Sequence, residues 1–277
     1  MPIVLGCNAD IYSAFTAAVP GAVGCRSYRD EVIRAARDVP TRFPGEPGSR
    51  VVASIRPYPD ALLKGHLDDA LLAMLRHGAA SFAAPQLTVW HEAGSLYRDL
   101  AYLTPPVVRL MHAKMQELCT QVAGVQYGCV ISGDISIMDR WIPYAPDALD
   151  WYGIDLHGNA PFDFATYDRL KAYLDGFRIL VQRRTGLSYP RINVCEASTR
   201  DESNRPQFFR NIARWLHHHG GCRMLASYRD GDAGGPWAAT DVDAINAFKI
   251  IVASYVHPPA GSGREQAPFR DGNPRLS

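Results

Sequence analysis

Short apolar runs rich in β-branched residues alternate along the chain with longer amphipathic stretches. The apolar runs predict eight strands, because their length and composition suit buried strands of a parallel sheet. The predicted strands are Pro2–Asn8, Ala22–Ser27, Arg50–Arg56, Ser81–His91, Val125–Ser132, Trp151–Leu156, Arg191–Glu196 and Cys222–Tyr228.

Most of the intervening stretches place apolar residues at helical spacing. The predicted helices are Ile11–Ala18, Pro59–His77, Pro105–Val122, Phe164–Thr185, Arg205–His219 and Asp241–Val256. In the second of these, Leu67, Leu71 and Met74 fall on one face, and Gly78 suits a helix C-cap.

Strands alternating with helices predict an α/β protein with a parallel sheet. A doubly wound open sheet is the competing arrangement. Eight units in 277 residues, with no Gly-rich phosphate loop after the first strand, favour a single (β/α)₈ TIM barrel. We expect residues 1–257 to form the barrel and residues 258–277, rich in Pro, Gly and Arg, to be a mobile tail.

Composition narrows the class of partner. The net charge of +1 argues against nucleic acid or an anionic membrane surface as partner, and no apolar run reaches the ~20 residues that span a bilayer. The N-terminus shows no signal peptide, so we expect a cytoplasmic protein or export by another route. The six cysteines are scattered and lack a CxxC motif, which predicts buried thiols, with a Cys7–Cys25 bridge left open. The oligomeric state also stays open.

Catalytic residues of such barrels lie at the carboxyl ends of the strands. The polar residues that close the apolar runs are Asn8, Asp10, Arg26, Tyr28, Arg56, His91, Glu92, Asp134, Asp155, His157, Glu196, Tyr228, Arg229 and Asp230. Two glutamates end their runs most abruptly, in Leu87-Thr-Val-Trp-His-Glu92 and Ile192-Asn-Val-Cys-Glu196.

A pair of carboxyl groups is what hydrolysis of a glycosidic bond requires. One protonates the leaving oxygen, and the other, roughly 5–5.5 Å away in retaining enzymes, attacks the sugar. Strands four and seven face each other across a barrel mouth, so Glu92 and Glu196 can form such a pair. Strict alternation along strand four would send His91 and Glu92 to opposite sides, so the strand must twist or bulge where it ends.

The segment Trp90-His91-Glu92, with a Glu ending strand seven, resembles the clan A retaining glycoside hydrolases. The His-Glu pair is similar to that of family 26, the β-mannanases and related endo-glycanases. The resemblance implies Glu92 as acid/base, Glu196 as nucleophile and His91 as a contact to the sugar or the nucleophile. It implies a carbohydrate substrate and endo action, and it leaves the sugar and the linkage open.

Further substrate contacts are expected at the same face. Arg56 is expected to meet Glu196 or a sugar hydroxyl, and Asp155 and His157 follow strand six. The last three candidates are Tyr228, Trp237 and Trp141, since aromatic side chains in loops can stack on sugar rings.

No cofactor or metal is expected. Three consecutive residues, His217, His218 and His219, point about 100° apart on a helix and cannot easily share one ion. Two alternatives to the hydrolase remain: a carbohydrate-binding or cell-surface-recognition module on a hydrolase-like barrel, and a barrel enzyme of other chemistry such as a lyase or aldolase. No lysine ends a predicted strand, which argues against Schiff-base chemistry.

Overall fold

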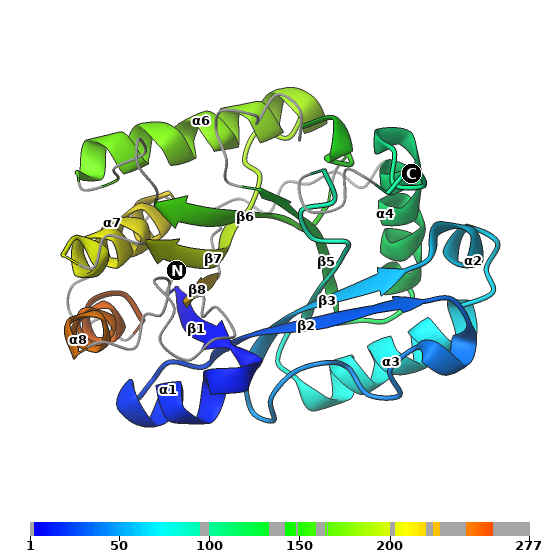
Figure 1. Cartoon of the computed structure of the whole chain (residues 1–277), viewed down its shortest axis with the longest axis horizontal. Helices are drawn as coiled ribbons and strands as arrows, with labels where there is room; N and C mark the ends of the chain where they lie inside the picture. Colours follow the sequence, from blue (N-terminus) through cyan, green and yellow to red (C-terminus); the bar gives the residue numbers. More distant parts are fainter. Residues whose placement is uncertain are drawn as a thin grey trace.

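A parallel sheet curled upon itself forms the centre of the molecule, with helices packed around it (Figure 1). The computed structural model describes residues 3–94, 100–132, 142–147, 149–158, 164, 166–199, 203–219, 224–227 and 242–256. The strands are β1 Val4–Asn8, β2 Gly24–Ile33, β3 Arg50–Pro57, β4 Gln86–Val89, β5 Gln126–Ser132, β6 Trp151–Gly158, β7 Ile192–Thr199 and β8 Met224–Ser227.

Each strand pairs in parallel with the next, and β8 pairs with β1, so that the strand order is that of a closed barrel. The seam between β7 and β8 is the least regular, with only Val194↔Leu225 and Ala197↔Ser227 in register. The helices are α1 Tyr12–Ala18, α2 Pro59–Leu63, α3 Asp68–Ser81, α4 Pro105–Thr120, α6 Tyr167–Thr185, α7 Arg205–His218 and α8 Val242–Ile251.

The predicted α/β class with a parallel, curled sheet is confirmed, but the helical ring departs from eight regular units. Among the described residues, a single 3₁₀ turn, Ala36–Asp38, is the helical element between β2 and β3, and Ile142–Tyr144 is the one between β5 and β6. The predicted tail, residues 258–277, lies outside the described residues.

Several predicted boundaries are wrong, among them the end of the second strand, which extends to Ile33 rather than Ser27. The strand expected from Ser81 begins at Gln86, because α3 continues through Ser81. The helix expected as one piece is broken into α2 and α3 at Gly65, whose φ of +77° suits glycine. Gly78 lies inside α3 rather than capping it, and its missing side chain admits the ring of Phe43.

Buried residues form two layers. The larger lies between the strands and the helices and includes the aromatic contacts of Phe248 on α8 with Phe15 on α1 and Phe209 on α7. The smaller consists of Val52, Val130, Trp151 and Cys195 on β3, β5, β6 and β7. Because these strands converge only inside the barrel, this second cluster marks its interior.

Polar side chains fill the barrel interior near the amino-terminal ends of the strands. The Asn193 amide nitrogen donates to Gln86 over 2.9 Å, and that of Gln86 donates to Gln126 over 3.0 Å. These bonds join β4, β5 and β7 and satisfy amides that burial would otherwise destabilise.

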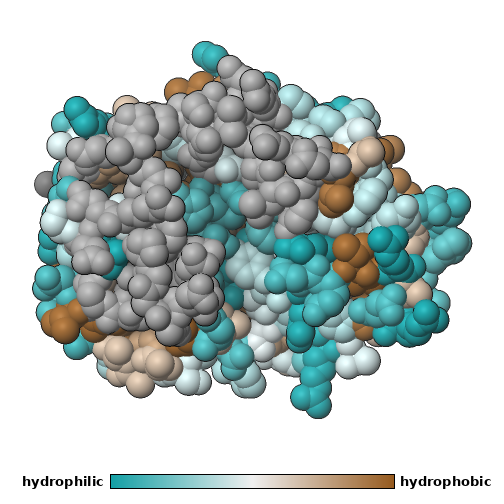
Figure 2. Space-filling model, viewed as in Figure 1, coloured by the Kyte–Doolittle hydropathy of each residue, from teal (hydrophilic) through white to brown (hydrophobic). Residues whose placement is uncertain are grey.

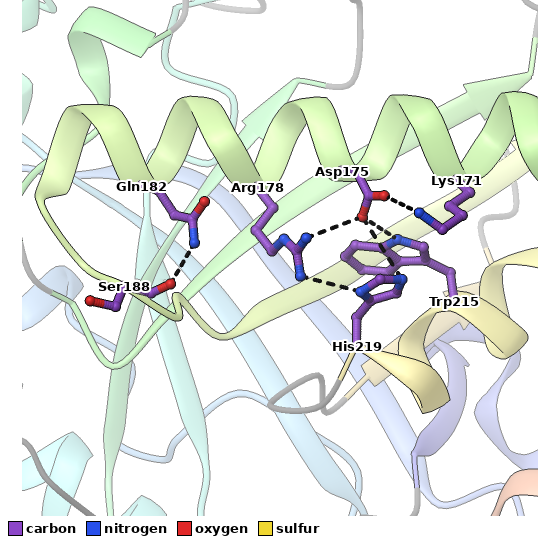
Figure 3. Close-up of polar contacts among 7 residues, drawn as sticks. All are labelled: Lys171, Asp175, Arg178, Gln182, Ser188, Trp215 and His219. Carbon is purple, nitrogen blue, oxygen red and sulfur yellow. Dashed lines mark hydrogen bonds and ion pairs between the residues drawn. The ribbon is translucent and has the colours of Figure 1, made fainter. Parts of the chain in front are cut away.

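On the outside, one carboxylate joins α6 to α7. Asp175 accepts from the Trp215 indole over 3.1 Å and pairs with Lys171 and Arg178 of its own helix (Figure 3). His219, at the end of α7, stacks on Trp215 with ring centroids 4.8 Å apart. Burial lowers the pKa of His217 and that of His219, and His219 Nδ1 lies 3.2 Å from the Arg178 guanidinium, so the run has a structural role in packing α7 on α6 rather than in binding a metal.

The first two strands approach so closely that only glycine fits. A Cβ on Gly6 would lie 2.3 Å from the carbonyl carbon and oxygen of Gly24, and backbone atoms cannot rotate away. Cys7 and Cys25 are the next register pair, and both are free, buried thiols.

We predict that Gly6→Ala lowers the free energy of unfolding by about 3 kcal/mol, because the clash forces β1 from β2. Gly176→Ala is the matched control: its Cβ would meet no atom within 4 Å, and replacing glycine within a helix should stabilise by about 0.5–1 kcal/mol. Urea unfolding of both variants measures the difference. Equal stability of the two would contradict the close approach.

Candidate active site

Polar side chains converge on the barrel interior at the carboxyl ends of the strands. On β3, Ser54 follows interior Val52 by two residues and therefore faces inward. Arg26 on β2 is the register partner of Val52, so it faces inward as well. On β6, Asp155 and His157 continue the inward face that Trp151 begins.

A β-bulge turns Glu196 inward. Ile154 pairs with Val194, but Asp155 pairs with Glu196, so Cys195 is the extra residue on β7. Cys195 belongs to the interior cluster, and Glu196 lies beside inward-facing Asp155. Two consecutive side chains thus share the interior, which strict alternation forbids and a bulge permits.

A strained turn interrupts the alternation of side chains directly after β4. The strand ends at Val89, and Trp90 and Glu92 both have left-handed backbone conformations, with φ of +46° and +53°. The Trp90 indole donates to the carbonyl of Pro57 over 2.7 Å, and the Glu92 amide donates to the carbonyl of Val130 over 3.0 Å. Alternation therefore stops before His91-Glu92, and the turn is fastened to β3 on one side and β5 on the other.

His91 is held inside the barrel mouth as a neutral ring. Its Nδ1 lies 3.0 Å from the hydroxyl of Ser54, and its ring contacts that of Tyr28 with centroids 4.5 Å apart. Burial, assisted by the charges of Arg26 and Arg56, holds its pKa well below the usual value. A neutral imidazole at this place can orient a sugar hydroxyl without adding another cation.

Arg26 supplies a fully buried positive charge. Its guanidinium lies over the Tyr28 ring, 4.5 Å from the centroid, and none of its nitrogens has a hydrogen-bond acceptor among the described residues. A buried guanidinium stays protonated, so it needs neighbouring negative charge. Its charge lowers the pKa of both Asp155 and Glu196 and opposes the larger effect of burial on each.

Asp155 is a third interior carboxyl group, fully excluded from solvent. Burial and the nearby charge of Glu92 hold its pKa well above the usual range, against the effects of Arg26 and of the Glu196 backbone amide. Since Asp155 has no exposed surface, direct contact with a sugar is not favoured by this geometry. Its place between Glu92 and Glu196 suits a group that tunes their charge.

Glu196 is buried and lies beside the more exposed ring of His157. Burial raises its pKa to about 7, and Arg26 opposes that rise. The His157 Nε2 lies 4.0 Å from its carboxylate, while His157 Nδ1 is 2.7 Å from the Ser198 hydroxyl. Burial lowers the pKa of His157 to about 4, so this contact joins a carboxyl to a neutral ring at neutral pH.

The predicted site residues therefore divide into three groups. His91, Glu92, Asp155, His157 and Glu196 come together in the barrel mouth. Arg56 pairs with Asp30, 2.6 Å between charged atoms, and its charge reaches His91. Tyr228, Trp237 and Trp141 lie outside the described residues.

Arg26 and Tyr28 are site residues that the sequence pattern did not predict, since it marks them only as polar ends of the second strand. A charged residue inside the run Ala22–Ser27 was the available signal, because burial of arginine requires partners. Ser54 and Ser198, which hold the two histidines, gave no signal in the sequence. Among the described residues, no group of three or more acidic, His or Cys side chains could hold a metal ion.

Solved structures with the same architecture are glycoside hydrolases and a related binding protein. A GH5_18 protein from Bifidobacterium longum subsp. infantis superposes with a TM-score of 0.62 at 10% identity, over 94% of this chain and 80% of that chain. A GH26 β-mannanase from Bacteroides ovatus gives 0.58 at 10% identity, over 92% and 89%. This is the fold of the clan A glycoside hydrolases.

A GH128 subgroup VII protein from Trichoderma gamsii, an oligosaccharide-binding protein, gives a TM-score of 0.55 at 13% identity, over 91% of this chain and 95% of that chain. No family model matches the sequence, and no curated protein does. Identities this low establish the fold alone.

Glu196→Gln should stabilise the protein in a pH-dependent way. Because the folded-state pKa is about 7 and the ordinary value 4.5, ionisation of Glu196 destabilises the fold progressively between these values and fully above pH 7. Glutamine resembles the protonated acid, so the gain should reach about 3 kcal/mol above pH 7 and vanish near pH 4.

Thermal unfolding across this pH range measures the gain. Glu117→Gln, the same change at a largely exposed position on α4, is the control. Parallel stability curves for wild type and Glu196→Gln would show that the carboxyl is not buried as described.

Proposed function

We propose that the protein is a retaining glycoside hydrolase that cleaves a polysaccharide or oligosaccharide by double displacement. Glu92 is the acid/base and Glu196 the nucleophile. The observation that carries the proposal is that two inward-facing carboxyl groups, Asp155 and Glu196, share one buried arginine at the carboxyl ends of the strands, with the charge of Glu92 close enough to act on Asp155.

The pKa values of the buried carboxyl groups suit the reaction. Burial raises the pKa of Asp155 well above its usual value and that of Glu196 to about 7, and the charge of Arg26 opposes both shifts. Double displacement needs one protonated carboxyl to assist the leaving oxygen and one carboxylate to attack the sugar. Arg26 favours ionisation of Glu196, the group assigned the attack.

The strained turn also supports the proposal. Left-handed residues other than glycine cost of the order of 1–3 kcal/mol and concentrate at functional sites. Here two of them, Trp90 and Glu92, flank His91 directly after β4, which supports a functional role for this turn.

The decisive test compares Glu92→Ala with Glu196→Ala on an activated aryl glycoside in the presence of azide. Both variants should lose at least ~10³-fold in hydrolysis of natural oligosaccharide. Azide should rescue Glu92→Ala with a glycosyl azide of retained configuration, because it attacks the covalent intermediate. Glu196→Ala should instead give the inverted azide. Glu117→Ala is the control, and full activity in either site variant would refute the assignment.

The pH dependence should follow the nucleophile. Since Glu196 must be ionised to attack, kcat/KM should fall as the pH drops below about 7. Arg26→Met should move this acid limb to higher pH, because the variant lacks the charge that favours the carboxylate. A rate profile with an unchanged acid limb in Arg26→Met would contradict the electrostatic role of Arg26.

A second candidate function is sugar binding without turnover. The oligosaccharide-binding GH128 protein, which has a similar fold, supports this alternative. The two differ in one measurement on the same oligosaccharides. Binding by calorimetry without any product favours the module, whereas product with retained anomeric configuration by proton NMR favours the hydrolase.

A further inference from the structure

A histidine–tyrosine pair lies directly behind the turn that carries Glu92. His112 on α4 and Tyr127 on β5 are both buried, with 1% and 0% of their surfaces exposed. The His112 Nδ1 and the Tyr127 hydroxyl oxygen are 2.7 Å apart. The barrel needs no polar group here, because α4 otherwise packs with apolar residues such as Met111 and Met115.

The pairing defines which nitrogen of His112 carries the proton. Burial lowers the pKa of His112 to about 3 and holds that of Tyr127 well above its usual value, so both groups are neutral. Within the described residues, the Tyr127 proton has His112 Nδ1 as its only acceptor. The hydroxyl therefore donates to Nδ1, and the single proton of the neutral ring resides on Nε2.

The Nε2–H group of this ring, whose residue is 1% exposed, then has no hydrogen-bond acceptor among the described protein atoms. His112 lines a small cavity of about 10 Å³, the space of one water molecule. The same cavity is lined by Glu92, Ala93 and Gly94 of the turn and by Ser132 at the end of β5. A donor, a hydroxyl and the polar groups of a turn provide the two to four partners that a buried water requires.

We propose that His112 is a positioning residue for Glu92, acting through one water molecule held in this cavity. His112 Nε2–H donates to the water, and the water donates to the Glu92–Gly94 turn. The proposal rests on the function proposed above for Glu92, but the hydrogen-bond arrangement itself does not.

Such a link has a clear physical purpose. Backbone bonds from Trp90 to Ile55 and from Glu92 to Val130 hold the turn to its neighbouring strands, while the left-handed conformation of Glu92 is strained. A fixed water would add a further restraint at the residue that must deliver a proton. Loss of the restraint should impair proton delivery more than sugar binding.

The first measurement needs no enzymatic activity. Imidazole ¹⁵N–¹H correlation spectra of the whole protein, assigned by comparison with His112→Leu, report the tautomer. The expected result is a proton on Nε2 with slow solvent exchange, and a high-resolution crystal structure should show one water within hydrogen-bond distance of Nε2. A proton on Nδ1, or a cavity without water, would overturn the proposal.

The second measurement is kinetic. His112→Leu should lower kcat roughly tenfold for an unsubstituted oligosaccharide, whose leaving group needs a proton, with little change in KM. It should have much less effect on the 2,4-dinitrophenyl glycoside of the same sugar, whose leaving group does not. His112→Gln, which retains a donor, should restore most of the loss, and Met115→Leu on the same buried helix face is the packing control.

The outcomes separate the two proposals. A wild-type protein that hydrolyses nothing refutes the hydrolase, while the tautomer and the water are still tested. An active enzyme in which His112→Leu slows both substrates equally, or matches Met115→Leu, refutes the positioning role alone.

Discussion

A single buried positive charge imposes the order of the barrel mouth. The Arg26 guanidinium cannot lose its proton and has left water, so the folded chain must surround it with negative charge and polarisable rings. Asp155 and Glu196 are the carboxyl groups whose ionisation the guanidinium favours against the effect of burial, and Tyr28 provides the ring face. The same cation helps to keep His91 neutral. Each of these groups would be destabilising alone, and together they make a site that is sensitive to the gain or loss of one proton.

Much of this arrangement follows from sequence periodicity. Buried parallel strands and amphipathic helices leave strong patterns, so the fold class and the strands carrying Glu92 and Glu196 could be predicted. The failures have physical reasons. Gly65 interrupts a continuous apolar stripe, and α3 extends to Ser81 because its packing on the barrel outweighs the propensity for a strand. Tertiary contacts decide such boundaries, and they are not encoded locally.

The directions in which the site side chains point could not be predicted from the alternation along the strands. Alternation would separate His91 from Glu92 and Cys195 from Glu196, and the chain evades it by two different devices, a left-handed turn and a β-bulge. Both cost local stability, and neither has a short sequence signature beyond the residues themselves. Arg26 shows the converse: its type alone signalled a buried partner, and only the three-dimensional arrangement identified the partner as the carboxyl cluster. The turn of Arg56 toward Asp30 depends on the extension of β2 to Ile33, which the shorter predicted strand missed.

The left-handed conformation of Glu92 gives this scaffold an evolutionary bias. Glycine at that position would relieve the backbone and delete a buried carboxyl group in one step, and two sources of instability would disappear with the chemistry. A chain under no selection for this carboxyl group would therefore gain stability by losing it, so the stability of the fold alone does not account for a glutamate at this position.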